Sequence, residues 1–128
     1  MRLMDVVTNY LYGDLDKDIY MNIPEELCNS MQLGKFHNPS IKSCKSIYGL
    51  KQADRMWYQH LSQYLISHGF KNDDICPSMF IKRHLREIVI IAIHVDDLNN
   101  IGTSNVIEDV VVMLSHQFEM KDVGLTTF

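Results

Sequence analysis

The chain has 128 residues, 46% of them hydrophobic and 22% charged, which is the composition of one ordinary globular domain. Its 12 Lys and Arg against 16 Asp and Glu give a net charge of −4, which argues against a free-standing, nonspecific nucleic-acid binder but not against an acidic catalytic site. Three scattered cysteines exclude a disulfide scaffold, and neither a signal peptide nor a membrane-length apolar run is visible, so we expect a soluble, intracellular protein.

The first half of the chain predicts two strands, a loop and a helix. Short apolar or alternating runs predict strands at residues 3–7 and 18–23. Residues 29–46 contain Gly, Asn, Pro and several Ser, and we expect a loop there. Apolar residues then recur at helical spacing, which predicts an amphipathic helix over residues 51–68 that ends at Gly69.

The second half predicts a hairpin, a further strand, a helix and a last strand. Strands are expected at residues 78–82, 88–94 and 98–102. A helix follows up to residue 118, with Asn105 and Glu108 as its capping box, and a last strand at residues 118–121. This order predicts an α+β fold, in which an antiparallel sheet carries two main helices on one face, of the ferredoxin-like or palm-like kind.

Charge is distributed unevenly along the chain. Between Asp14 and Glu26 there are five acidic residues and one lysine, whereas residues 40–60 carry Lys42, Lys45, Lys51 and Arg55 against one acid. An acidic segment and a basic segment in one small domain prompt a search for a site that handles phosphates with metals.

The most informative segment runs from residue 88 to residue 102, where six aliphatic residues lead into His94, Val95, Asp96 and Asp97. Two adjacent carboxylates repel each other and resist desolvation, and a divalent cation relieves both costs. The alternative is a polar hairpin turn, in which Asp is common. Because consecutive strand residues point to opposite faces, a shared metal site needs another carboxylate. Asp5, within an apolar strand, is the candidate, unless it occupies an exposed edge position.

Four ordered blocks carry a family resemblance over nearly the whole chain: MDVVTNYLYGDLDKDIYM, SIYGLKQADRMWY, HVDD and FEMKDVG. Together they resemble the reverse transcriptase domain of copia-type long-terminal-repeat retrotransposons, especially those of plants. The resemblance implies a single partial palm domain over residues 1–128, with the fingers and thumb of the polymerase missing. It also implies RNA-directed DNA polymerase activity, in which two Mg²⁺ ions (or Mn²⁺) drive nucleotidyl transfer onto a primer 3′-hydroxyl.

The resemblance assigns roles to individual residues. Asp5, Asp96 and Asp97 match the catalytic, metal-binding aspartates, with Asp5 and Asp96 holding the two ions. Five further residues are implied in binding nucleotide or template: Tyr10 under the incoming sugar, Gln52 near nucleotide and template, Lys51 and Arg55 on phosphates, and Lys121 near the triphosphate. The alternatives are a core tyrosine for Tyr10 and solvated helix charges for Lys51 and Arg55. We expect Trp57 to lie in the core.

The implied partners are an RNA or DNA template-primer, deoxynucleotides, and the rest of the retroelement polyprotein with its fingers, thumb and ribonuclease H. No membrane partner is expected, and the implied location of an expressed chain is the cytoplasm, in virus-like particles. Several positions depart from the family pattern: Asn9, Asp54, His94, Asn99 and Asn100. Two alternatives therefore stay open: an inactive, truncated relic, and a small nucleic-acid-binding module that uses the basic segment.

Overall fold

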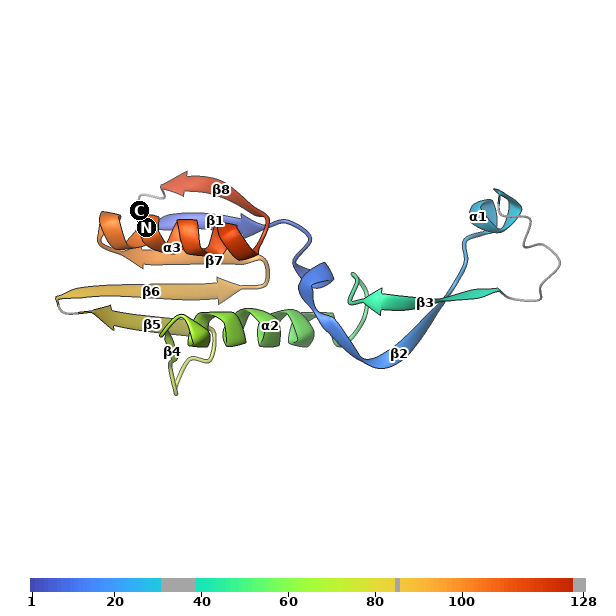
Figure 1. Ribbon diagram of the computed structural model, residues 1–128, viewed down its shortest axis with the longest axis horizontal. Helices are drawn as coiled ribbons and strands as arrows, with labels where there is room; N and C mark the ends of the chain where they lie inside the picture. The colour runs from blue at the N-terminus through green and yellow to red at the C-terminus, as the bar shows by residue number, and fades with distance from the viewer. Residues whose placement is uncertain (31–38, 85, 126–128) are drawn as a thin grey trace.

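The body of the protein is a six-stranded antiparallel sheet. The computed structural model describes residues 1–30, 39–84 and 86–125. The strand order is β4-β5-β6-β7-β1-β8, so the first strand lies between the last two (Figure 1). The strands are β1 (Arg2–Val6), β4 (Lys71–Asn72), β5 (Met79–His84), β6 (Glu87–His94), β7 (Asp97–Gly102) and β8 (Met120–Leu125).

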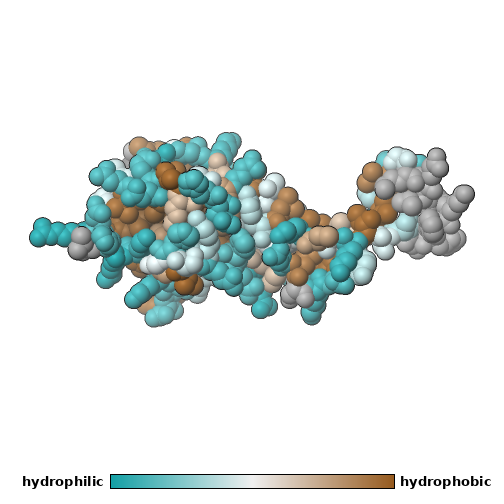
Figure 2. Space-filling view, viewed as in Figure 1, coloured by the Kyte–Doolittle hydropathy of each residue, from teal (hydrophilic) through white to brown (hydrophobic). Residues whose placement is uncertain are grey.

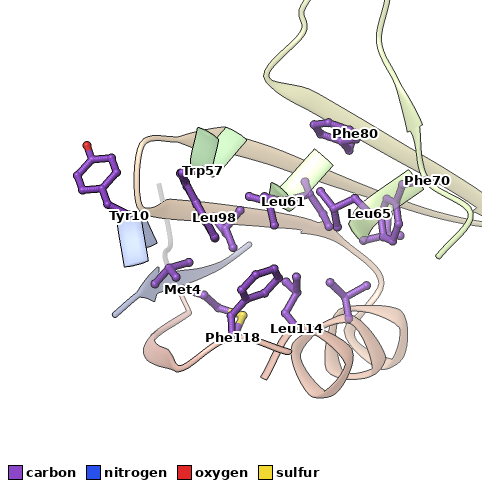
Figure 3. Close-up of a cluster of buried hydrophobic side chains, with 14 of the residues drawn as sticks. Met4, Tyr10, Trp57, Leu61, Leu65, Phe70, Phe80, Leu98, Leu114 and Phe118 are labelled. Carbon is purple, nitrogen blue, oxygen red and sulfur yellow. The ribbon is translucent and has the colours of Figure 1, made fainter. Parts of the chain in front are cut away.

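Two helices cover one face of this sheet, as the sequence predicted. They are α2 (Ala53–Ser67) and α3 (Ser104–Gln117). Alternate strand residues, such as Met4, Ile91 and Leu98, are buried, and they form one hydrophobic cluster with buried residues of both helices (Figure 3). This confirms a mixed fold of helices and antiparallel sheets. No helix in the described ranges is long and apolar enough to span a bilayer.

The other face of the sheet is not covered by any part of the chain that the structure describes. Strand alternation and register place Leu3, Ile81, Ile90 and Ile101 on this face. Each of them is next in sequence to a residue that is buried against the helices, and Ile90 is the register partner of both Ile81 and Ile101. Ile101 remains 42% exposed. The domain therefore has a packed side and an open side, and we call the latter the open face.

A second, two-stranded sheet forms an arm that extends away from the body (Figure 1). It pairs β2 (Asp14–Asn22) with β3 (Ser40–Lys45), and α1 (Glu25–Ser30) lies at its far end. The 3₁₀ helix η1 (Asn9–Tyr12) joins β1 to the arm. Apolar atoms are visible along the arm in Figure 2, and Leu27 and Ile41 are 49% and 45% exposed.

The predicted loop at residues 29–46 is wrong where β3 lies, and its residues 31–38 fall outside the described ranges. Most of β3 is exposed, so it lacks the apolar pattern that identifies a strand, and pairing with β2 alone makes it one. The acidic and basic segments meet here, because Lys42 pairs with Asp18 at 2.7 Å and Lys45 pairs with Asp14. These pairs neutralise half of the basic residues that a separate nucleic-acid-binding module was expected to use.

Two boundaries near the C-terminus also differ from the prediction. α3 begins after Thr103, whose extended backbone starts the helix two residues before the predicted cap, so the capping box of Asn105 and Glu108 is wrong. The last strand covers residues 120–125 rather than 118–121, because Phe118 ends α3 and is buried in the core.

Asn100 is a buried polar side chain on an interior strand of the sheet. It is fully buried on the helix side of β7. Its Oδ1 atom has no hydrogen-bond partner among residues 1–30, 39–84 and 86–125, although Nδ2 donates weakly to the carbonyls of Arg2 and Leu98 at 3.4 and 3.3 Å. A buried polar atom without a partner costs about 1–3 kcal/mol.

We therefore expect Asn100→Leu to raise the free energy of unfolding by about 1 kcal/mol, because an apolar side chain of similar size needs no partner. Urea denaturation measures the change. Asn99→Leu is the matched control, since Asn99 is the half-exposed neighbour on the open face and surface changes usually stay within about 0.5 kcal/mol. A lower stability for Asn100→Leu than for the control would show that the amide is needed for the strand.

Candidate active site

Asp5 is the fourth of the five residues of β1, and its side chain lies on the open face. Its neighbours Met4 and Val6 are 1% and 2% exposed and point to the helices, so strand alternation directs Asp5 the other way. β1 is paired on both sides, with β7 and with β8, so the alternative of an exposed edge position is wrong.

The paired aspartates lie at the turn between β6 and β7. His94 and Asp97 are register partners, which leaves Val95 and Asp96 as the two residues of the turn. The local alternative, a hairpin turn, is therefore correct as structure, but the turn does not stand alone. It adjoins β1, because the backbone amide of Val6 donates to the carbonyl of Asp96 at 3.0 Å.

Three charged residues form one row across neighbouring strands. Asp97 on β7 is the register partner of Asp5 on β1, and Asp5 is in turn the register partner of Lys121 on β8. Directly opposite residues of antiparallel strands share a face and interact, and two like charges in such positions destabilise the sheet. The row therefore places an unfavourable acid pair beside one cation on the open face, with Asp96 in the adjoining turn.

The two carboxylates in this row offer the kind of oxygen ligand that Mg²⁺ prefers. No group of three or more His, Cys, Asp or Glu residues among those described is arranged as a ready-made metal site. Mg²⁺ binds hard oxygen ligands, keeps several of its waters and takes only one or two carboxylates from a protein, with substrate phosphates completing its shell. The facing carboxylates of Asp5 and Asp97 fit that requirement, and the cation would relieve their repulsion.

Tyr48 is a residue of this site that sequence reasoning missed. Its hydroxyl lies 3.4 Å from Oδ2 of Asp96, and its ring meets that of Tyr10 edge to face at 4.4 Å between centroids. Partial desolvation of a side chain that is still 68% exposed, followed by the negative charge and hydrogen bond of Asp96 and then the charge of Asp5, raises the pKa of Tyr48. Both acids therefore act on the same phenol, although they are far apart in sequence. The signal was available, because Tyr48 belongs to the block SIYGLKQADRMWY.

Tyr10 is both a core residue and part of the site. It is 8% exposed, and its hydroxyl donates to Oδ1 of Asp54 in the first turn of α2 at 2.5 Å. Asp54, which departs from the family pattern, thus anchors the ring that Tyr48 touches. This hydrogen bond first, and burial second, raise the pKa of Tyr10 to about 12.

The Tyr10–Asp54 contact predicts a loss of stability at alkaline pH. The folded state holds the phenolic proton more tightly than the unfolded state, whose tyrosine pKa is about 10. Stability from this contact is therefore complete below pH ~10 and falls as pH rises to about 12. We expect Tyr10→Phe to remove the phenolate absorbance step near pH 12 and to flatten the alkaline loss. Tyr20→Phe, at a 62% exposed position on the arm, should leave the step intact, and the reverse pattern would refute the assignment.

The remaining predicted residues lie near the start of α2. Gln52 is the N-cap of α2 and is half-buried. Lys51 precedes it and Arg55 lies in the first turn of the helix, and both side chains are exposed. Their exposure is equally typical of phosphate-binding cations and of solvated charges, so their roles stay predictions.

Trp57 lies in the core, as predicted, and it also contacts the turn. It is 2% exposed, and its Nε1 donates to the carbonyl of Val95 at 2.8 Å. Val95 has a φ of 56°, a left-handed conformation that is rare for a β-branched residue and costs about 1–3 kcal/mol. The turn that carries Asp96 is therefore strained and held from the helix side.

Comparison with known proteins matches the whole chain, residues 1–128, to the family described as reverse transcriptase (RNA-dependent DNA polymerase). A retrovirus-related Pol polyprotein from transposon TNT 1-94 of Nicotiana tabacum is 36% identical over 123 residues, which are 94% of this chain and 9% of the polyprotein. The corresponding polyprotein from transposon RE1 of Arabidopsis thaliana is 33% identical over 123 residues, or 95% of this chain and 8% of its own length.

A putative transposon Ty5-1 protein of Saccharomyces cerevisiae is 31% identical over 124 residues, which cover 94% of this chain and 38% of that protein. No solved structure matches the chain. The chain spans less than a tenth of the two plant polyproteins. These matches confirm the resemblance drawn from the four sequence blocks: the chain belongs to the reverse transcriptase (RNA-dependent DNA polymerase) family.

Proposed function

We propose that this chain is the palm part of an RNA-directed DNA polymerase and adds deoxynucleotides to a primer 3′-hydroxyl. The observation that carries the proposal is the row of Asp97, Asp5 and Lys121 on the open face, with Asp96 in the adjoining turn. Nucleotidyl transfer requires carboxylates that can bind divalent cations, and a lysine next to them can bind the phosphates of the nucleotide.

Each residue of the site has a proposed task. Asp5 and Asp96 would hold two Mg²⁺ ions, or Mn²⁺, with the assistance of Asp97. When bound, the metal supplies positive charge that stabilises the attacking and leaving oxygens. Lys121 would bind the triphosphate as a point charge. Tyr10, supported by Tyr48, would pack under the sugar.

The primer–template would lie along the open face, with Lys51 and Arg55 on its phosphates and Gln52 near the nucleotide and template. Phosphate contacts fix the position of a nucleic acid without reading its sequence. Because the chain spans so little of its plant relatives, we propose that other parts of a polyprotein, including fingers, thumb and ribonuclease H, help to hold the substrate. We expect the isolated chain to be weakly active, since positioning supplies several kcal/mol of catalysis. We propose cytoplasmic virus-like particles as its location.

Metal-linked stability tests the carboxylate site directly. We expect Mg²⁺ to raise the unfolding free energy of the native sequence, by about 2.7 kcal/mol at a hundred times the dissociation constant. Asp5→Asn should gain little from Mg²⁺, because it removes one of the two facing carboxylates that would hold the ion. Asp109→Asn, at an exposed position on α3, is the matched control and should respond to Mg²⁺ normally. An equal response of the Asp5 and Asp109 variants would remove the metal role.

A second candidate is a relic of such an enzyme that folds poorly and has no activity. It is favoured by three buried polar atoms that have no hydrogen-bond partner within the described part of the chain: Nδ2 of Asn9, Oγ of Ser46 and Oδ1 of Asn100. Cores that lose such partners lose stability. Broad, non-cooperative thermal unfolding of the isolated chain would support the relic, whereas a sharp transition would count against it.

A further inference from the structure

The turn that carries Asp96 is fixed through its two carbonyl groups. The turn contains Val95 and Asp96, and each carbonyl accepts a hydrogen bond from outside the hairpin. Trp57 Nε1 holds the carbonyl of Val95 at 2.8 Å from the helix side, and the backbone amide of Val6 holds that of Asp96 at 3.0 Å from β1. The amide that fixes Asp96 belongs to the residue next to Asp5, so this second bond ties the two acid-bearing segments together.

The Trp57 donor belongs to a buried ring that is packed between other rings. The indole is 2% exposed, meets the ring of Phe118 edge to face at 5.3 Å and lies 6.0 Å from the ring of Tyr12. A ring held on several sides presents its N–H in one direction. Val95, in contrast, needs such support, because its φ of 56° is unfavourable for a β-branched side chain.

We propose that Trp57 is a positioning residue of the polymerase site: its indole N–H holds Val95 in the left-handed conformation and thereby sets the place of Asp96 relative to Asp5. The inference deepens the proposed function and rests on it for the consequence in metal binding. A purely structural role for Trp57 would require only its apolar ring, since packing makes no use of the N–H. The two roles therefore separate when the ring is kept and the donor is removed.

Trp57→Phe makes that separation. Its Mn²⁺ affinity, measured from the free-ion signal in electron paramagnetic resonance, should fall about tenfold, as expected when a group supporting a metal ligand is lost. In the same variant the amide of Val6 should exchange with solvent faster, because its acceptor is no longer fixed. Tyr58→Phe is the matched control: it removes a 2.7 Å hydrogen bond from the adjacent helix residue to the carbonyl of Pro77, and should change neither quantity.

Val95→Gly in the Trp57→Phe background distinguishes positioning from damage to the core. Glycine adopts positive φ without strain, so the double variant should recover most of the Mn²⁺ affinity although the indole is still absent. Failure of this rescue, or an unchanged affinity and unchanged Val6 exchange in Trp57→Phe, would overturn the inference. If the native sequence binds no Mn²⁺, the proposed function fails instead, whereas the exchange of the Val6 amide still tests whether Trp57 fixes the turn.

Discussion

Asp96→Asn is expected to lower primer extension by the chain by roughly 10²–10³-fold, the usual loss when one group that stabilises transition-state charge is removed. Asparagine keeps the size of the side chain but removes its negative charge, so a divalent cation is held far less tightly. The backbone of residue 96 should stay in place, because its carbonyl accepts from the amide of Val6 whichever side chain is present. The fold is therefore expected to survive while the chemistry is lost.

The measurement is extension of a labelled primer on an RNA template with Mg²⁺, made beside circular dichroism of each variant. Asp109→Asn removes an exposed carboxylate from α3, away from the site, and should keep native activity. Similar activity in the Asp96 and Asp109 variants would end the catalytic assignment. A native chain that binds Mn²⁺ yet extends no primer would instead favour the relic.

Phe118→Ala is expected to cause the largest loss of stability, about 3–5 kcal/mol. Phe118 is 2% exposed at the end of α3, and its ring meets those of Tyr12, Trp57 and Tyr64 edge to face at 5.1–5.3 Å. Truncation removes the buried area and leaves a cavity among rigid rings that cannot collapse into it. Because a domain of this size is stable by only about 5–15 kcal/mol, a large part of its stability depends on this one ring.

Chemical denaturation gives the loss directly, and Val112→Ala is its control. Val112 lies on the same helix but is 56% exposed, so its truncation should change the unfolding free energy by less than about 0.5 kcal/mol. A comparable loss in both variants would mean that burial in the aromatic cluster does not set the cost of truncation at Phe118.

Segments with a strong apolar periodicity were predictable, because the spacing of their apolar residues shows which side chains are buried. The helix expected at residues 51–68 is present as α2, and the strand expected at 88–94 is present as β6. β3 was missed because it is mostly exposed and is a strand only through its pairing with β2. The start of α3 differs from the prediction because its N-cap, Thr103, has an extended backbone but makes no side-chain capping hydrogen bond, so no capping motif marks it in the sequence.

Some residues of the site were likewise predictable from the sequence, and others were not. The blocks pointed to Asp5, Asp96, Asp97 and Lys121, and the structure brings the last two of these beside Asp5 by strand pairing. Tyr48 belongs to one of the blocks, but its contact with Asp96 and the second role of Trp57 each depend on one contact across the fold, which no local pattern shows. In the sequence Asp54 stands out only as a departure from the family pattern, whereas its contact with Tyr10 gives it a structural role.

The sequence by itself determined the family, the residue types available for chemistry and the elements whose apolar periodicity is strong, because these depend on neighbours along the chain. The tertiary structure alone decided that the first strand inserts between the last two, which places Asp5 between Asp97 and Lys121. It also decided that the acids face the uncovered side of the sheet while a tryptophan holds their turn from the other side. Such arrangements follow from strand order and packing over long sequence distances, which no local pattern encodes.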